Sequence, residues 1–196
     1  ATADGDLGVD FEIEFKPYQL DPTAAPGVAG PVFDAYAKKF GGPDRAREII
    51  DHVTTTAARD GLAFQMDRAQ RANTLLAHRL IWRAGQNRSH ATQAETKERL
   101  LQAYFVDGVH IGSVEALADV VAELGDARDE VVQFLESEAG TAEVAADLDD
   151  ARDQGITAVP TYVFQGQWAV PGAQDPATFA KVFTRMAERA LADQTS

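Results

Sequence analysis

The sequence predicts an α/β fold in which helices dominate and strands lie only near the two ends. Three observations support this prediction: an alternating segment at residues 9–15, amphipathic segments separated by glycines between residues 31 and 155, and two short β-rich runs after Gly155. Alternation with a period of two is typical of a strand with one buried face, whereas apolar residues spaced by three or four are typical of helices. The expected order is strand, many helices, β-hairpin, helix.

The first expected strand covers residues 9–15, where apolar and charged residues alternate. The breaking pairs Asp21-Pro22 and Pro26-Gly27 follow it, so we expect the strand to end before them. The apolar positions of the alternation are Val9, Phe11, Ile13 and Phe15.

Proline, glycine and capping residues divide the helical region. Pro31 and Pro43 each stand where a helix can begin, and Gly41-Gly42 can end the first of these helices. Ser113 and Asp126 are expected to cap the helices that follow them. Further helices are predicted around three other segments, which begin near Leu75, near Leu100 and at Thr141.

The last forty residues change character. Residues 156–164 and 168–170 are β-rich runs separated by Gln165-Gly166-Gln167, which predicts a hairpin. Asp175-Pro176 can then supply the cap and first residue of a closing helix.

Composition excludes several classes of function. The 196 residues are 45% hydrophobic, which suits a globular fold, and no apolar run approaches the roughly 20 residues that a membrane helix needs. Eighteen basic against 31 acidic residues give a net charge of -13, which disfavours a nucleic-acid partner. The absence of cysteine removes thiol chemistry and thiolate metal sites, and it is compatible with a cytoplasmic location, which we expect.

Four segments, taken in order, resemble DsbA-like thioredoxin-fold proteins of the FrnE type. Residues 15–22 (FKPYQLDP) resemble the family's F-x-L-D-P segment, and residues 73–80 (NTLLAHRL) resemble its N-T-x-x-A-H-R-L helix. Residues 155–160 (GITAVP) and 172–174 (GAQ) resemble its G-x-T-x-V-P and G-A-Q segments. The resemblance extends over nearly the whole chain.

The resemblance implies an α/β thioredoxin-like fold with a large all-helical insertion. The thioredoxin-like part would comprise residues 1–28 and 155–196, and the insertion residues 29–154. Family members begin with a strand and a helix that carries Cys-x-x-Cys, where the helix dipole favours the thiolate. This sequence lacks that first strand and first helix and starts with Ala1, which favours a fragment of a longer protein. We therefore expect residues 9–15 and 161–164 to be unpaired with each other, about 10 Å apart, with room for one strand between them.

The activity that the resemblance implies is thiol-disulfide exchange with protein or small-molecule disulfides. The chain itself has no cysteine and is expected to be inactive in this chemistry. Two alternatives stay open: a relative of the glutathione-dependent isomerases and kappa-type transferases, and a non-redox thioredoxin-fold protein that binds peptides.

The resemblance also implies substrate-binding residues. The Val159–Pro160 peptide would be cis, with Ala158 and Val159 presenting backbone groups to an extended substrate, and Asn73 and His78 would lie at the cleft. For Asn73 and His78 a helix cap and a structural hydrogen bond are the alternative. No catalytic residue is assigned, because the Cys-x-x-Cys motif is absent, and no cofactor is expected. No metal site is expected either, because His52, His90 and His110 share no metal-ligand spacing with one another or with His78. The expected partners are protein or peptide thiols and disulfides, with glutathione as a further candidate, and neither nucleic acid nor a membrane is expected; the oligomeric state is left open.

Overall fold

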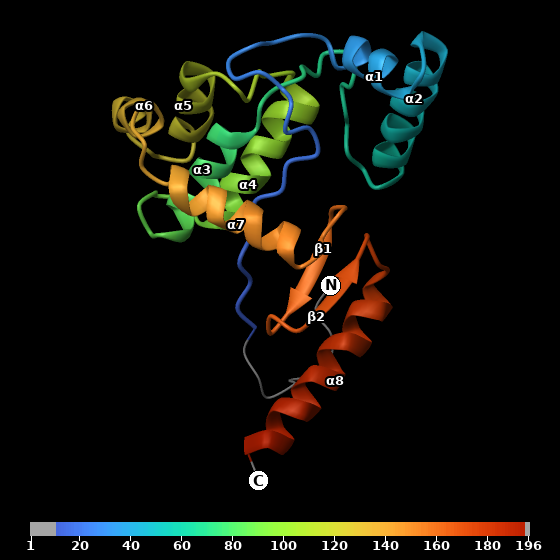
Figure 1. Cartoon of the computed structure of the whole chain (residues 1–196), viewed down its shortest axis with the longest axis vertical. Coiled ribbons are helices and arrows are strands. Elements are labelled where there is room, and N and C mark those ends of the chain that lie inside the picture. The colour runs from blue at the N-terminus through green and yellow to red at the C-terminus, as the bar shows by residue number, and fades with distance from the viewer. Residues whose placement is uncertain (1–10, 195–196) are drawn as a thin grey trace. The chain divides into compact units, whose positions relative to one another are not determined.

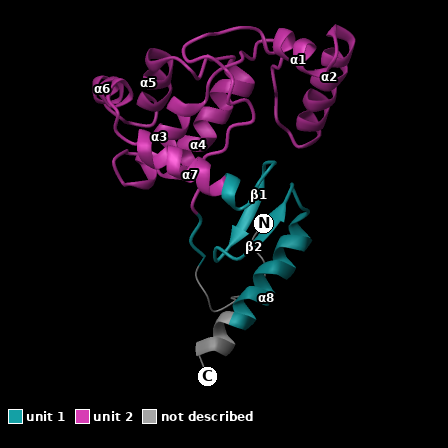
Figure 2. Cartoon of the chain, viewed as in Figure 1, with its two compact units in different colours: residues 1–13, 152–196 teal, residues 14–151 magenta. Residues whose placement is uncertain are grey.

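The computed structural model describes the backbone of residues 11–194 and the side chains of residues 11–189. The chain divides into two compact units (Figure 2): a helical unit, residues 14–151, and a hairpin unit, residues 1–13 and 152–196. The domain limits expected from the sequence, after residues 28 and 154, remain a prediction, because compactness alone does not define a functional domain.

The helical unit contains the long helical region that the sequence predicts (Figure 1). Pro31 directly precedes the first helix, Pro43 is the first residue of the second, and Gly41 ends the first with a φ of 96°, as expected. The hydroxyl of Ser113 accepts a hydrogen bond of 3.3 Å from the Ala116 N–H, which confirms the predicted cap. The helices are α1 (Val32–Phe40), α2 (Pro43–Arg59), α3 (Leu75–Gly85), α4 (Gln93–Gln102), α5 (Val114–Ala122), α6 (Arg128–Glu136) and α7 (Thr141–Asp153).

Two apolar clusters hold the helical unit together. In the larger cluster, side chains from α3, α4, α5 and α6 pack around Leu80, Leu117, Val121 and Val131, each no more than 3% exposed. The smaller cluster joins α1 and α2 to the segment around Met66. Burial of such side chains stabilises each cluster by about 1.5–3 kcal/mol per large residue.

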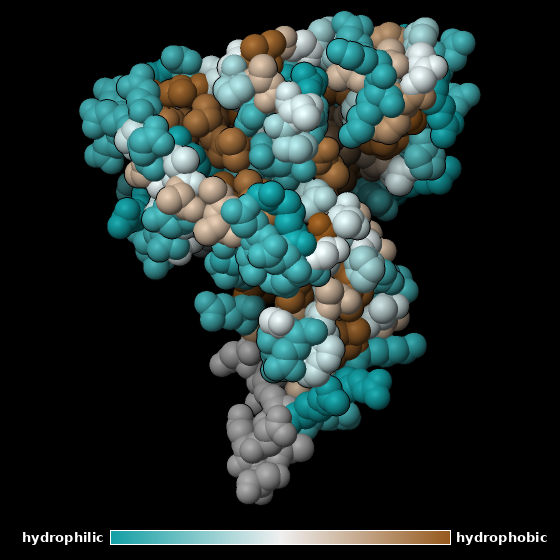
Figure 3. Space-filling model, in the orientation of Figure 1, coloured by the Kyte–Doolittle hydropathy of each residue, from teal (hydrophilic) through white to brown (hydrophobic). Residues whose placement is uncertain are grey.

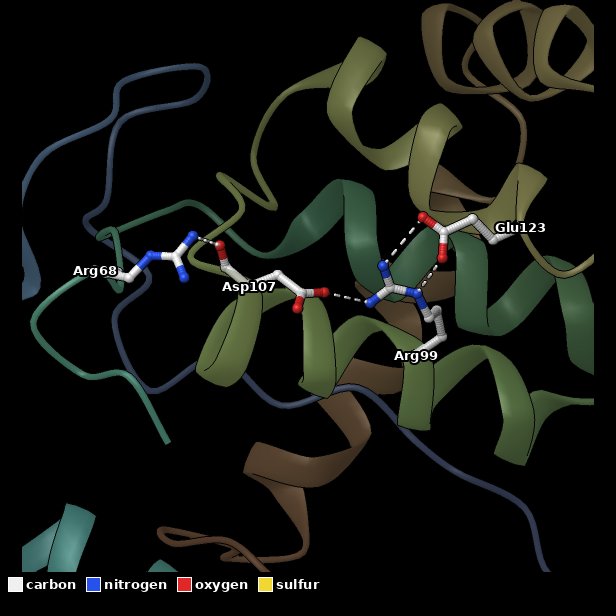
Figure 4. A network of polar contacts seen from close by, with 4 residues as sticks. All are labelled: Arg68, Arg99, Asp107 and Glu123. Atoms are coloured by element: carbon white, nitrogen blue, oxygen red, sulfur yellow. Dashed lines mark hydrogen bonds and ion pairs between the residues drawn. The ribbon is translucent and has the colours of Figure 1, made fainter. Parts of the chain in front are cut away.

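A π-helical turn, η1 (Ala103–Asp107), follows α4 without a break and was not predicted from the sequence. Its last residue, Asp107, lies in the network of Figure 4: the carboxylate pairs with Arg99 at 2.8 Å, and the carbonyl accepts from Arg68 at 2.7 Å. Arg99 also pairs with Glu123 at 2.9 Å. These contacts tie the end of the π-helical turn to the segment before α3 and to the end of α5.

The hairpin unit contains β1 (Thr161–Phe164), β2 (Trp168–Pro171) and α8 (Pro176–Gln194). The strands are antiparallel, with Tyr162 opposite Val170 and Phe164 opposite Trp168, which confirms the predicted hairpin. The Asp175 carboxylate accepts from the Thr178 N–H at 3.0 Å, so the predicted cap of the closing helix is also confirmed. Within the described part of the chain, no helix has the length and apolar character needed to cross a membrane.

The strand predicted over residues 9–15 is not formed in the part that the structure describes; Val9 and Asp10 lie outside it. Residues 11–15 belong to no strand. The side-chain amide of Gln93 satisfies the Phe15 backbone instead, accepting from its N–H at 2.7 Å and donating to its carbonyl at 3.0 Å. A strand needs a ladder partner, and at Phe15 one side chain takes the place of that partner.

The predicted cap at Asp126 is also wrong. The residue before α6 is Ala127, and no side chain caps that helix. The Asp126 carboxylate accepts hydrogen bonds from Arg83 at 2.7 Å, from the Ser89 hydroxyl at 2.8 Å and from the His90 N–H at 2.8 Å. A buried arginine nearby competes for the carboxylate more strongly than a helix end does.

Candidate functional site

The loop that leads into β1 carries three of the residues predicted to bind substrate. The Val159–Pro160 peptide bond is cis, the geometry that the resemblance implies. The Thr161 hydroxyl donates to the Ala158 carbonyl at 2.8 Å, and the Gly172 N–H donates to the Pro160 carbonyl at 2.7 Å. The side chain of Val159 is 44% exposed, so this loop presents an apolar group to solvent.

The two faces of the hairpin differ in what covers them. On one face Tyr162 contacts Phe179 of α8 with ring centres 4.6 Å apart, and Phe164 contacts Phe183 at 5.8 Å. Side chains alternate between faces along a strand, so Val163 points to the face opposite α8; it is 39% exposed, as is Tyr162 on the face that α8 contacts. Figure 3 shows apolar surface among hydrophilic residues in the part of the molecule that β1 and β2 occupy.

One edge of β1 is unpaired within residues 11–194, because β2 is its sole partner there. The Gly172 N–H donates to the Pro160 carbonyl, so these two residues form a hydrogen-bonded pair of the antiparallel ladder. Because such pairs alternate with non-hydrogen-bonded ones, the even-numbered residues of β1 direct their backbone groups at β2. The backbone groups of Thr161 and Val163 consequently point away from β2. This edge can accept another strand.

The hairpin unit buries very little. Ala187 is the only buried side chain among the described residues of this unit, at 4% exposure. A two-stranded hairpin is marginally stable by itself, and it normally gains stability from further strands or a covering helix. Packing on α8 supplies part of that cover, and in the described part of the unit one edge of β1 has no further strand beside it.

Asn73 and His78, the other two predicted site residues, lie in the helical unit and both hold residues 18–24. The Asn73 amide donates to the Ala24 carbonyl at 2.8 Å and accepts from the Leu75 N–H at 3.0 Å. His78 Nε2 lies 3.1 Å from the Tyr18 carbonyl, and burial lowers the pKa of its imidazole although that carbonyl acts in the opposite direction. The neutral ring therefore donates to Tyr18.

A small pocket is lined by His78 and by other residues of the same unit, including Glu14, Trp82, Gln93 and Asp147. Among residues 11–194, no three acidic or histidine side chains come together in a way that could hold a metal ion.

Arg79, the residue after His78, was not singled out as a site residue, although it belongs to the motif at residues 73–80. Arg79 is 6% exposed, and its guanidinium donates to four carbonyls at the end of α6 and in the following loop, at 2.6–3.0 Å. The four carbonyls belong to Phe134, Leu135, Ser137 and Ala139. One side chain thus replaces the cap that the carboxyl end of α6 would otherwise need.

The fold and these motifs define the class of protein. The family model of the DSBA-like thioredoxin domain matches residues 2–184, so the chain belongs to that family. The thioredoxin-like fold with a helical insertion and the family-level oxidoreductase assignment are therefore confirmed.

Among solved structures, the chain is similar to a probable DsbA oxidoreductase from Streptomyces coelicolor, with 27% sequence identity and a TM-score of 0.71. The match covers 88% of this chain and 72% of that chain. No curated protein sequence matches the chain significantly.

Proposed function

We propose that this chain is the greater part of a FrnE-type thiol-disulfide oxidoreductase whose two cysteines lie on a strand and helix outside these residues. The observation that carries the proposal is the hairpin unit, in which, among the described residues, one edge of β1 is unpaired and Val163 is exposed on the face away from α8. A strand beside β1 and a helix over that face would supply both. The match covers 72% of the S. coelicolor oxidoreductase, and the part of that protein outside the match could hold such a strand and helix.

The chemistry would be two successive exchanges. A cysteine thiolate attacks a substrate disulfide, which forms a mixed disulfide and releases one substrate thiolate. The second cysteine then attacks the mixed disulfide, releases the second substrate thiolate and leaves a disulfide in the enzyme. The substrates would be protein or peptide disulfides, with glutathione a further candidate, and a cytoplasmic location would favour the reducing direction.

Ala158, Val159 and Pro160 are proposed to contact an extended substrate. Their loop is exposed and adjoins the free edge of β1, where backbone groups and an apolar side chain are available together. Asn73 and His78 would contribute to substrate binding indirectly, through the segment they hold, because their side chains form hydrogen bonds to the Ala24 and Tyr18 carbonyls of the chain itself.

The proposal is tested by expressing the protein from its complete reading frame and comparing it with the 196-residue chain in insulin reduction by dithiothreitol. The longer protein is expected to exceed 21.1 kDa, to contain two cysteines that titrate with a thiol reagent and to accelerate insulin reduction. The 196-residue chain is expected to leave the uncatalysed rate unchanged, because thiol exchange requires a thiolate. A complete protein of the same mass, or equal activity of the two, contradicts the proposal.

A binding experiment tests whether the loop that contains Val159 contacts the substrate. Val159→Asp is expected to weaken the affinity for alkylated insulin B chain about tenfold, or about 1.4 kcal/mol, by placing a charge in an apolar contact. Thr184→Asp, on the exposed side of α8, adds the same charge as a control and is expected to change nothing. Chemical shifts of the 15N-labelled chain report both titrations. Peptide binding that is unaffected by Val159→Asp would remove this loop from the substrate site.

A further inference from the structure

The loop at residues 158–160 has some of its backbone groups already in use. The Ala158 carbonyl accepts from the Thr161 hydroxyl at 2.8 Å, and the Pro160 carbonyl accepts from the Gly172 N–H at 2.7 Å. Proline has no N–H to offer. Among residues 11–194, neither backbone group of Val159 forms a hydrogen bond. In this part of the chain, Val159 is therefore the residue of the loop with both a free N–H and a free carbonyl.

A residue with both groups free can pair with an extended peptide. In a hydrogen-bonded pair of an antiparallel ladder, one residue donates its N–H and accepts at its carbonyl, and peptides that dock along a protein backbone use this pairing. Ala158 is left as a donor, because its carbonyl is already engaged, and the Pro160 carbonyl is engaged as well. The Val159 side chain is 44% exposed and available for an apolar contact. The bonds on either side of Val159 thus decide which residue an extended substrate can pair with.

The G-A-Q segment, residues 172–174, holds one of these bonds in place. The Pro171 carbonyl and the Gly172 N–H belong to one planar peptide unit, in which they point in opposite directions. The Gln174 amide donates to that carbonyl at 3.0 Å, which aims the N–H at Pro160. Gly172 has a φ of 79°, in the left-handed region that glycine adopts without a steric penalty. The segment therefore orients one peptide unit against the loop.

We propose that Thr161, Gly172 and Gln174 are positioning residues of the substrate site, which together make Val159 the residue that pairs with the backbone of an extended substrate. Thr161 acts through the Ala158 carbonyl. Gly172 and Gln174 act through the Pro160 carbonyl. The inference rests on the proposed function for the location of the site, and it adds how the loop selects one residue. It involves no thiol step, so the 196-residue chain can test it.

Binding of alkylated insulin B chain, followed by NMR of the 15N,13C-labelled chain, measures the role of Thr161. Thr161→Val keeps the branched shape and removes the hydroxyl, so the affinity is expected to fall about fivefold as the Ala158 carbonyl is released. Thr161→Ser keeps the hydroxyl and is expected to bind within about twofold of the unaltered chain. Thr184→Val is the matched control: it removes a hydroxyl that donates to the Ala180 carbonyl at 2.9 Å within α8, and it should change nothing.

A pair of glycine substitutions separates positioning from general stability. Gly172 and Gly166 have φ values of 79° and 66°, and an added Cβ would meet no heavy atom nearer than 3.9 Å at either. Alanine therefore imposes a similar backbone cost at both positions. Gly172→Ala is expected to weaken peptide binding about fivefold, as is Gln174→Leu, whereas Gly166→Ala, in the turn at the other end of the hairpin, should leave the affinity unchanged. Equal weakening by the two glycine variants overturns the proposal.

The unaltered chain supplies a readout that needs no variant. On peptide binding, the carbonyl 13C shift of Val159 is expected to move more than those of Ala158 and Pro160, and a larger shift at either neighbour overturns the proposal. Equal affinity of Thr161→Val and the unaltered chain, or a Thr161→Ser variant that binds as weakly as Thr161→Val, also overturns it and leaves the proposed function standing. Failure of the unaltered chain to bind the peptide is a different result: it contradicts the substrate loop of the proposed function, and the positioning roles are lost with it.

Discussion

Replacing Arg79 with methionine is expected to lower the free energy of unfolding by about 4 kcal/mol. The guanidinium is buried and donates to four carbonyls, and a hydrogen bond from a charged group contributes about 1.5–3 kcal/mol net. Methionine fills a similar volume but donates nothing, so the end of α6 loses its cap. The expected loss is smaller than four times the contribution of one such hydrogen bond, because water can reach some of the released carbonyls.

Urea denaturation followed by circular dichroism measures this loss. Arg45→Met is the matched control, since Arg45 is exposed and pairs only with Glu48 three residues along, a contact worth less than about 0.5 kcal/mol. Arg79→Lys is expected to fall between the two, because an ammonium has three donors and cannot reach four carbonyls in the plane of a guanidinium. A loss below about 1 kcal/mol in Arg79→Met would show that these bonds contribute little net stability.

Replacing Asp126 with alanine is expected to destabilise the helical unit by about 3–5 kcal/mol. The substitution leaves Arg83, which is 8% exposed, with a buried charge and no carboxylate partner, and it also removes the acceptor for Ser89 and His90. Asp119→Ala is the control. Asp119 pairs with Arg128 at the surface, where both side chains are well exposed, so its loss should cost less than about 1 kcal/mol.

The contribution of Asp126 should also depend on pH. Burial would raise the pKa of this carboxyl, but the His90 N–H, the Ser89 hydroxyl and Arg83 outweigh burial and hold the pKa below its ordinary value of 3.8. The stabilisation is therefore complete above that value and is lost as the pH falls through the pKa of the folded form. The difference in the free energy of unfolding between the unaltered chain and Asp126→Asn should therefore become smaller as the pH falls below 3.8. A difference that is constant from pH 7 to pH 2.5 would contradict this account.

The sequence predicts most of the helices because their ends are marked by local chemistry. Pro31, Ser113 and Asp175 act within a few residues of their own positions, so a short window of sequence is enough to place them. The hairpin is equally local, since its two strands are joined by one tight turn.

Errors occur where the partner is distant in sequence. Asp126 is an ordinary capping residue, and only the fold brings Arg83, 43 residues away, against it. Phe15 meets Gln93 across 78 residues, and no alternating pattern can show that a helix side chain will occupy the ladder position. The motif at residues 73–80 was recognised, but its pattern cannot tell that Asn73 and His78 bind the carbonyls of Ala24 and Tyr18 or that Arg79 caps α6.

The uneven burial of side chains affects how the chain should melt. Nearly every buried apolar side chain among the described residues lies in 14–151, so a calorimetric peak should report the cooperative loss of that unit. The hairpin and α8 expose little new apolar area on unfolding and should melt broadly, with a small heat-capacity change. Equilibrium curves from different probes need not coincide, and a single midpoint would describe only the helical part of the molecule.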